Sequence, residues 1–149
     1  MKKLQIAVTA AAVLLTAFAA WRLAKVSFAP SYLSVIRMNW GVSLPENCRE
    51  IYETDSGASF HGDGERCHVF QYHADVLSSL PVSKGAVPEK DRENIEKILS
   101  ALQVEKKYCP GLAAMTGEGS RDKYGDGSDR VYFLYDGSTK ILYVAESFL

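Results

Sequence analysis

We expect an α+β domain in which an antiparallel sheet of about four strands, arranged as two hairpins, is covered by one long amphipathic helix and a short N-terminal helix. Three observations predict this class. Two pairs of strand-like segments are separated by turn residues, one segment has apolar residues at helical spacing, and the length suits one domain. Of the 149 residues, 47% are hydrophobic and 23% are charged, a composition typical of a globular protein.

The first 26 residues are expected to be separate from this domain. A basic start precedes an uncharged apolar segment, residues 4–21. This segment reaches the lower limit of a membrane span, about 17 apolar residues, while residues 17–19 also fit the cleavage site of a secretory signal. We expect residues 1–26 to be a membrane anchor or a signal peptide and residues 27–149 to be an extracytoplasmic domain. A single span at the cell membrane is favoured, and secretion after cleavage is the alternative.

The domain is acidic once the N-terminal segment is set aside. The chain has 17 Lys and Arg and 18 Asp and Glu. Four of the basic residues and none of the acidic ones precede residue 27, which leaves 13 basic against 18 acidic side chains, a net charge of −5. A nucleic-acid-binding surface needs a basic excess, so we exclude nucleic acid as a partner.

A short helix is expected at the start of the domain. Leu33, Ile36 and Trp40 follow Pro30 at helical spacing, and Gly41 suits the left-handed residue at which many helices end. The helix should be about nine residues long and pack on the sheet through its apolar side chains.

The first hairpin is predicted from residues 49–54 and 65–72. The first of these segments alternates imperfectly between polar and apolar residues, and the second is more regular. Glycine and aspartate between them indicate a long turn. If the tip of the hairpin is centred between Gly57 and Ala58, residues whose numbers sum to 115, such as Cys48 and Cys67, lie opposite each other.

The long helix is predicted after Pro88, because four apolar residues recur at helical spacing and acidic residues gather in the first turn. These apolar residues are Ile95, Ile98, Leu99 and Leu102. The preceding residues, 74–87, favour a short helical turn followed by a loop.

The C-terminal third should contain an irregular loop, residues 109–129, and then the second hairpin, residues 130–135 and 140–145. The loop is rich in glycine and charge. If residues 136–139 form the turn, Phe133 lies opposite Leu142.

Three cysteines occur in a chain with an export-like N-terminus. Cys48 and Cys67 flank the first hairpin and are the favoured disulfide pair. A bridge through Cys109 and the absence of any bridge are the alternatives.

The histidines do not predict a metal site. His61, His68 and His73 surround Cys67 in the sequence, but strand alternation places Cys67 and His73 on one face and His68 on the other. A zinc site needs ligands that converge, so no metal ligand, no cofactor and no catalytic residue is assigned.

Two loops are the expected binding surface, because loops on a rigid frame often carry function. One contains Phe60-His61-Gly62-Asp63-Gly64, and the other resembles the start of a calcium loop but has Tyr124 and Phe133 where ligands are required. The candidate binding residues are Phe60, His61, Asp63, Glu65, Asp122 and Asp126.

Residues 51–72, with their Phe-His-Gly-Asp-Gly string behind an N-terminal apolar segment, resemble small exported or membrane-anchored proteins of Gram-positive bacteria that carry this motif. The resemblance leaves the C-terminal half unmatched. It implies a location in the cell envelope and contributes no catalytic residue.

The expected function is therefore non-enzymatic: an extracytoplasmic, membrane-tethered domain that binds a protein or a component of the cell envelope. The alternative is a small hydrolase or a metal-dependent activity centred on His61, Asp63 and Glu65, since a histidine beside two carboxylates suits acid and base catalysis. A third interpretation is a calcium-stabilised adhesion or inhibitor domain.

Overall fold

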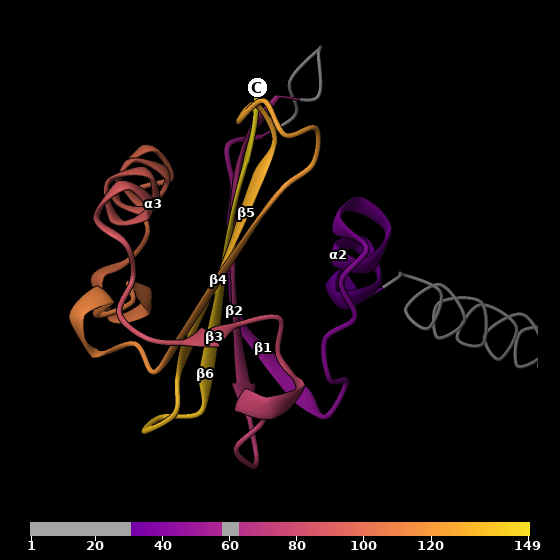
Figure 1. Ribbon diagram of the computed structural model, residues 1–149, viewed down its shortest axis with the longest axis vertical. Coiled ribbons are helices and arrows are strands. Elements are labelled where there is room, and N and C mark those ends of the chain that lie inside the picture. The colour runs from indigo at the N-terminus through magenta and orange to yellow at the C-terminus, as the bar shows by residue number, and fades with distance from the viewer. Residues whose placement is uncertain (1–30, 58–62) are drawn as a thin grey trace, which may run out of the picture. The chain divides into compact units, whose positions relative to one another are not determined.

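The computed structural model describes residues 31–57 and 63–149 (Figure 1). The described residues form six strands, two α-helices and three short 3₁₀ helices. In chain order these are α2 (Tyr32–Trp40), β1 (Cys48–Asp55), β2 (Gly64–Tyr72), η1 (Leu77–Ser79), β3 (Ser83–Lys84), α3 (Glu89–Ala101), η2 (Lys106–Tyr108), η3 (Leu112–Ala114), β4 (Gly117–Asp122), β5 (Arg130–Asp136) and β6 (Ile141–Phe148).

All six strands belong to one antiparallel sheet with the order β1-β2-β6-β5-β4-β3. The prediction of four strands covered by one long helix is therefore wrong. The two expected hairpins, β1-β2 and β5-β6, are present and lie side by side because β2 pairs with β6. The sheet continues past β5 through β4 and the two-residue β3, which were not predicted as strands.

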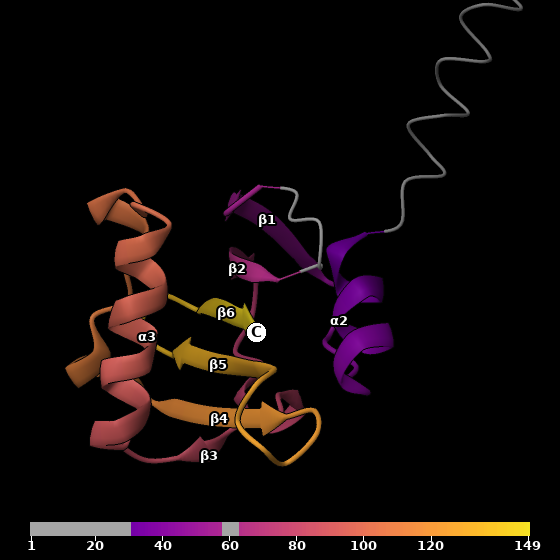
Figure 2. The ribbon, with the colours of Figure 1, turned by 90° about the horizontal axis from the view of Figure 1, so that it is seen from above.

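Helix α3 covers one face of the sheet (Figure 2). Its buried residues are the ones that the sequence pattern indicated, and they pack on side chains that project from β2, β5 and β6. Alternation along the strands sends every second side chain to this face. The buried cluster comprises Cys67, Val69, Val87, Ile95, Ile98, Leu99, Leu102, Leu112, Met115, Tyr132, Leu134, Tyr143 and Ala145.

The opposite face of the sheet is also buried, although it carries three polar contacts to the segments that cover it. The Tyr72 hydroxyl donates to the carbonyl of Pro45 at 3.3 Å. The Tyr135 hydroxyl donates to Asp75 at 3.1 Å and accepts from the amide of Val76 at 3.3 Å. Both faces of the central strands are therefore covered, which explains why β5 and β6 have an almost unbroken apolar sequence.

Strand β4 lies where the sequence predicted an irregular loop. A side chain at Gly119 would place its Cβ 2.1 Å from the carbonyl oxygen of Pro81, and one at Gly117 would meet Val82 at 2.8 Å. The glycines are thus needed because the 77–82 segment crosses close above the strand. The high glycine content predicted a loop, but here the glycines allow the 77–82 segment to lie close to a strand.

The second hairpin is shifted by two residues from its predicted register. Phe133 lies opposite Val144, and Leu142 lies opposite Tyr135. Asp136 pairs with Ile141, and its carboxylate accepts hydrogen bonds from the backbone amide and hydroxyl of Ser138 at 2.9 and 2.6 Å. The four-residue turn therefore starts one residue later than expected, and a shift of two keeps each side chain on its predicted face.

Both predicted helices are confirmed. Helix α2 has nine residues, and Gly41 after it has a φ of +65°. Helix α3 has 13 residues and begins directly after Pro88.

The predicted disulfide between Cys48 and Cys67 is wrong, and all three cysteines are free. Cys67 pairs with Thr54, six residues along β1 from Cys48. At about 3.4 Å per residue the two cysteines are roughly 20 Å apart, far beyond the roughly 7 Å that a disulfide tolerates. The residue numbers of the pairs sum to 120 or 121, so the register is not the one, with a sum of 115, that a tip centred between Gly57 and Ala58 would give.

In residues 31–57 and 63–149 no helix is long and apolar enough to cross a membrane. The two described α-helices have 9 and 13 residues, whereas a span needs about 20. The described structure therefore gives no support to the expected single N-terminal span or to the cell-membrane location that depends on it, and neither is retained. The predicted anchor itself, residues 4–21, lies outside the described residues.

Candidate metal centre

The candidate loop residues from the sequence do not form one site in the described structure. Phe60 and His61 lie outside the described residues. Asp63 is exposed, and Glu65 is half-buried on β2. The loop that contains Asp122 and Asp126 follows β4 at the same end of the sheet as Glu65, because Glu65 and Arg130 both pair with Ser147. Glu65 and Ser128 line one pocket there, but Asp122 and Asp126 are not part of its lining.

Asp122 shapes its own loop. Its carboxylate accepts hydrogen bonds from the backbone amides of Gly125 and Gly127, both at 2.7 Å, and pairs with the guanidinium of Arg130 at 3.2 Å. Partial desolvation opposes these contacts, yet together they lower the pKa of Asp122. Asp126 accepts in the same way from the amide and hydroxyl of Ser128.

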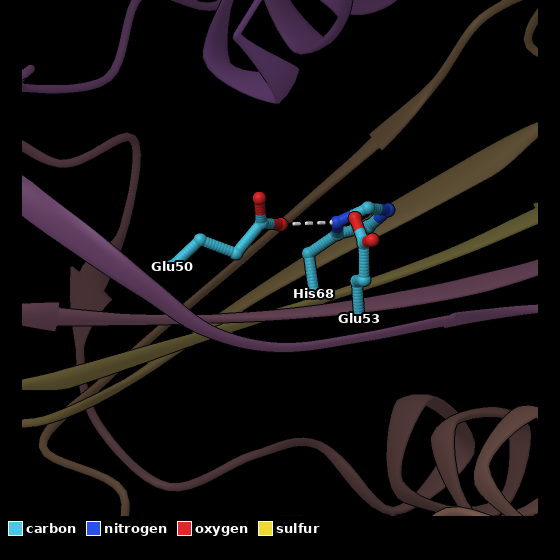
Figure 3. Close-up of side chains that lie close together, drawn as sticks. All are labelled: Glu50, Glu53 and His68. Atoms are coloured by element: carbon cyan, nitrogen blue, oxygen red, sulfur yellow. Dashed lines mark hydrogen bonds and ion pairs between the residues drawn. The ribbon is translucent and has the colours of Figure 1, made fainter. Parts of the chain in front are cut away.

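A different group of side chains converges on the first hairpin. Glu50 and Glu53 on β1 and His68 on β2 bring two carboxylates and one imidazole together, with one ligand atom from each residue within 4.8 Å of the others (Figure 3). Within the part of the chain that the structure describes, no other three His, Cys, Asp or Glu residues come together in this way.

A β-bulge in β1 places both glutamates on the same face. Glu50 pairs with Phe70 and Tyr52 pairs with Val69, so Ile51 is an extra residue on β1. In a regular strand residues 50 and 53 would point to opposite faces. The bulge instead turns Ile51 and Tyr52 together toward the α3 face, where both pack against the buried cluster. Glu50 and Glu53 are thereby left on the face of His68.

The imidazole is the buried member of the group. His68 is 5% exposed, and its Nδ1 lies 2.5 Å from Oε1 of Glu50, whose side chain is 31% exposed. Glu53 lies directly opposite His68 in the strand register, and Figure 3 shows its carboxylate beside the imidazole ring. The ring is therefore held in place by its burial and by Glu50, while the two carboxylates reach solvent.

A buried carboxylate, that of Glu146, lies on the same face of the sheet as His68. Glu146 on β6 has no exposed surface and accepts a hydrogen bond from the indole N–H of Trp40. Burial raises the pKa of its carboxyl to about 8. The register places Glu146 opposite Arg66, two residues before His68. Glu146 is therefore largely uncharged at neutral pH.

Glu50 and Glu53 are not among the residues that the sequence predicted for a site. Their separation of three residues places them on opposite faces of any regular strand, so the pattern gave no reason to combine them with His68. The imperfect alternation of residues 49–54 was the available signal, because a bulge interrupts alternation. The assignment of His68 to the face opposite Cys67 agrees with the structure.

Comparison of the chain with protein-family models, with curated proteins and with solved structures found no significant match. The resemblance to exported proteins with a Phe-His-Gly-Asp-Gly motif stays a prediction.

Proposed function

We propose that this protein is a metal-binding domain that holds a divalent transition metal between Glu50, Glu53 and His68. The observation that carries the proposal is the bulge at Ile51, since it alone brings both carboxylates onto the face of a buried histidine. Bulges are common next to active sites, where they change the direction in which a side chain of the strand points.

The type of ligand favours a transition metal over calcium or magnesium. Imidazole nitrogen suits zinc, copper, iron and nickel, whereas calcium and magnesium prefer oxygen ligands alone. Zinc accepts carboxylate oxygens as well as imidazole nitrogen as ligands. Three protein ligands leave at least one coordination position for water or for a bound molecule.

The distances require a small closure of the site. Ligand atoms at about 2.1 Å from one ion are at most about 4.2 Å apart, and the three atoms here lie within 4.8 Å of one another. Side-chain rotation can bring the exposed carboxylate oxygens of Glu50 and Glu53 closer by the remaining fraction of an ångström, while the buried ring of His68 stays fixed. Rigid support of the histidine and mobile carboxylates suit capture of an ion from solvent.

Calorimetric titration of the metal-free protein with zinc sulfate and with manganese chloride tests the proposal. We expect one ion to bind per chain, with zinc binding more tightly than manganese. The double variant E50Q/E53Q should lose at least tenfold in zinc affinity, because amide oxygens are weaker ligands than carboxylates. Both side chains reach solvent, so the variant should fold.

The matched control is E93Q/E96Q, which removes the same two negative charges from the exposed surface of α3. Its zinc affinity should equal that of the wild-type protein. Absence of zinc binding to the wild-type protein, or equal losses in both double variants, would refute the assignment. Cobalt substitution offers a further readout, since visible absorption bands report the coordination of the ion directly.

The earlier expectation of a domain that binds a protein or an envelope component without catalysis remains a prediction and is compatible with a metal site. The hydrolase alternative depended on His61, which lies outside the described residues, and on Asp63 and Glu65. No contact between these two carboxylates supports it.

A further inference from the structure

A pocket of about 310 Å³ lies on the α3 face of the sheet, away from the metal centre. Its floor is formed by Ile98 and Tyr132, and its walls come from α3, the loop before β5 and the end of β6. This volume is at the lower end of the range for small-molecule sites, about 300 to 1,000 Å³. The pocket is therefore suited to one small ligand.

The wall from α3 presents Lys90, Asn94 and Lys97 in one line along the helix. Residues at these spacings share a face. The Asn94 side-chain amide donates to the hydroxyl of Tyr132 at 3.1 Å, and Tyr132 is only 1% exposed, so the floor is held in place. The lysines, by contrast, have no ion-pair partner among the described residues.

The charge of the pocket differs from that of the domain. Arg130 also lines it, but its guanidinium is held by Asp122 at 3.2 Å and by Asp91 at 3.7 Å. The two lysines therefore supply the positive charge of the lining, in which Glu65 is the one acidic side chain. A concave surface that keeps two unpaired cations in an acidic domain attracts anions.

We propose that this pocket binds a small organic anion whose carboxylate or phosphate groups contact Lys90 and Lys97. The two lysines are seven residues apart, about 10 Å along the helix axis, so a ligand with more than one anionic group can contact both. The apolar floor of Ile98 and Tyr132 accepts the carbon skeleton of the ligand.

The test is calorimetric titration at low ionic strength with two probes, citrate and inorganic phosphate. We expect 1:1 binding of citrate to the wild-type protein and at least a tenfold loss of affinity in K90Q/K97Q, because glutamine keeps the helix but removes both charges. Tighter binding of phosphate than of citrate would place a phosphate group, rather than carboxylates, against the lysines.

The control K84Q/K106Q removes two exposed lysines outside the pocket and should bind citrate as the wild-type protein does. In ¹H–¹⁵N spectra, citrate should shift the side-chain amide of Asn94 and the backbone amide of Ser128. Equal losses of affinity in both double variants would show attraction to charge in general and overturn the proposal. If neither probe binds at about 10 mM, a concentration at which even a very weak complex forms, the proposal is overturned as well.

Discussion

Replacement of Glu146 by glutamine should stabilise the protein at neutral pH and remove much of its pH dependence. Glu146 has no exposed surface, and its Oε1 accepts a hydrogen bond from the indole of Trp40. Burial raises the pKa of its carboxyl from the ordinary 4.5 to about 8. Arg66 lies opposite Glu146 on β2, and its guanidinium lies over the ring of Phe148, 5.0 Å from the centroid.

The magnitude follows from the difference between the two pKa values. Below pH 4.5 the carboxyl is protonated in both the folded and the unfolded protein and its full contribution to stability is present. Between pH 4.5 and about 8 the unfolded chain ionises while the folded protein keeps its proton. The free energy of unfolding therefore falls by about 1.4 kcal/mol for each pH unit, or about 3 kcal/mol by pH 7.

Glutamine does not ionise, has nearly the same size and keeps an oxygen that accepts the hydrogen bond from Trp40. We expect E146Q to be about 3 kcal/mol more stable than the wild-type protein at pH 7 and within about 1 kcal/mol of it at pH 4.5. Urea unfolding followed by tryptophan fluorescence at pH 4.5, 5.5, 7 and 8 measures this difference. The control is E96Q on the exposed surface of α3.

The pH dependence of the difference decides the interpretation. A stability difference that is the same at pH 4.5 and pH 7 would show that ionisation of Glu146 is not its cause. Lower stability of E146Q at pH 7 would show that the folded protein holds an ionised carboxylate, contrary to the effect of its burial.

Two further predictions concern packing. G119A should destabilise the protein by about 3 kcal/mol, because the added Cβ would lie 2.1 Å from the carbonyl oxygen of Pro81. The control G111A, with no atom within 4 Å of the added Cβ, should change the stability by less than about 1 kcal/mol. Urea unfolding measures both variants, and equal effects would contradict the close approach of Pro81 to Gly119. Burial raises the pKa of the Cys67 thiol to about 12, so at pH 8 the native protein should show at most two thiols that react with a disulfide reagent and three after unfolding. Three thiols of equal reactivity in the native protein would be inconsistent with the buried position of Cys67.

The sequence by itself determined the elements whose signals are local. The 13-residue helix after Pro88 follows from apolar spacing and an acidic first turn, and the nine-residue helix ends at a glycine with positive φ. The two hairpins follow from strand-like segments on either side of turn residues. Each of these elements has a signal in its own stretch of the chain, where neighbouring side chains determine the local structure.

Tertiary structure decided the sheet order, the role of the glycine-rich segment and the candidate metal centre. Gly119 lies in a strand because residues 77–82 cross above it, a contact that no local pattern encodes. The bulge at Ile51 exists because both Ile51 and Tyr52 gain burial on the α3 side, and this packing sends Glu50 and Glu53 to the other face. The physical reason is that burial of two adjacent apolar side chains outweighs the alternation of a regular strand, and only the packed sheet provides the surface that buries them.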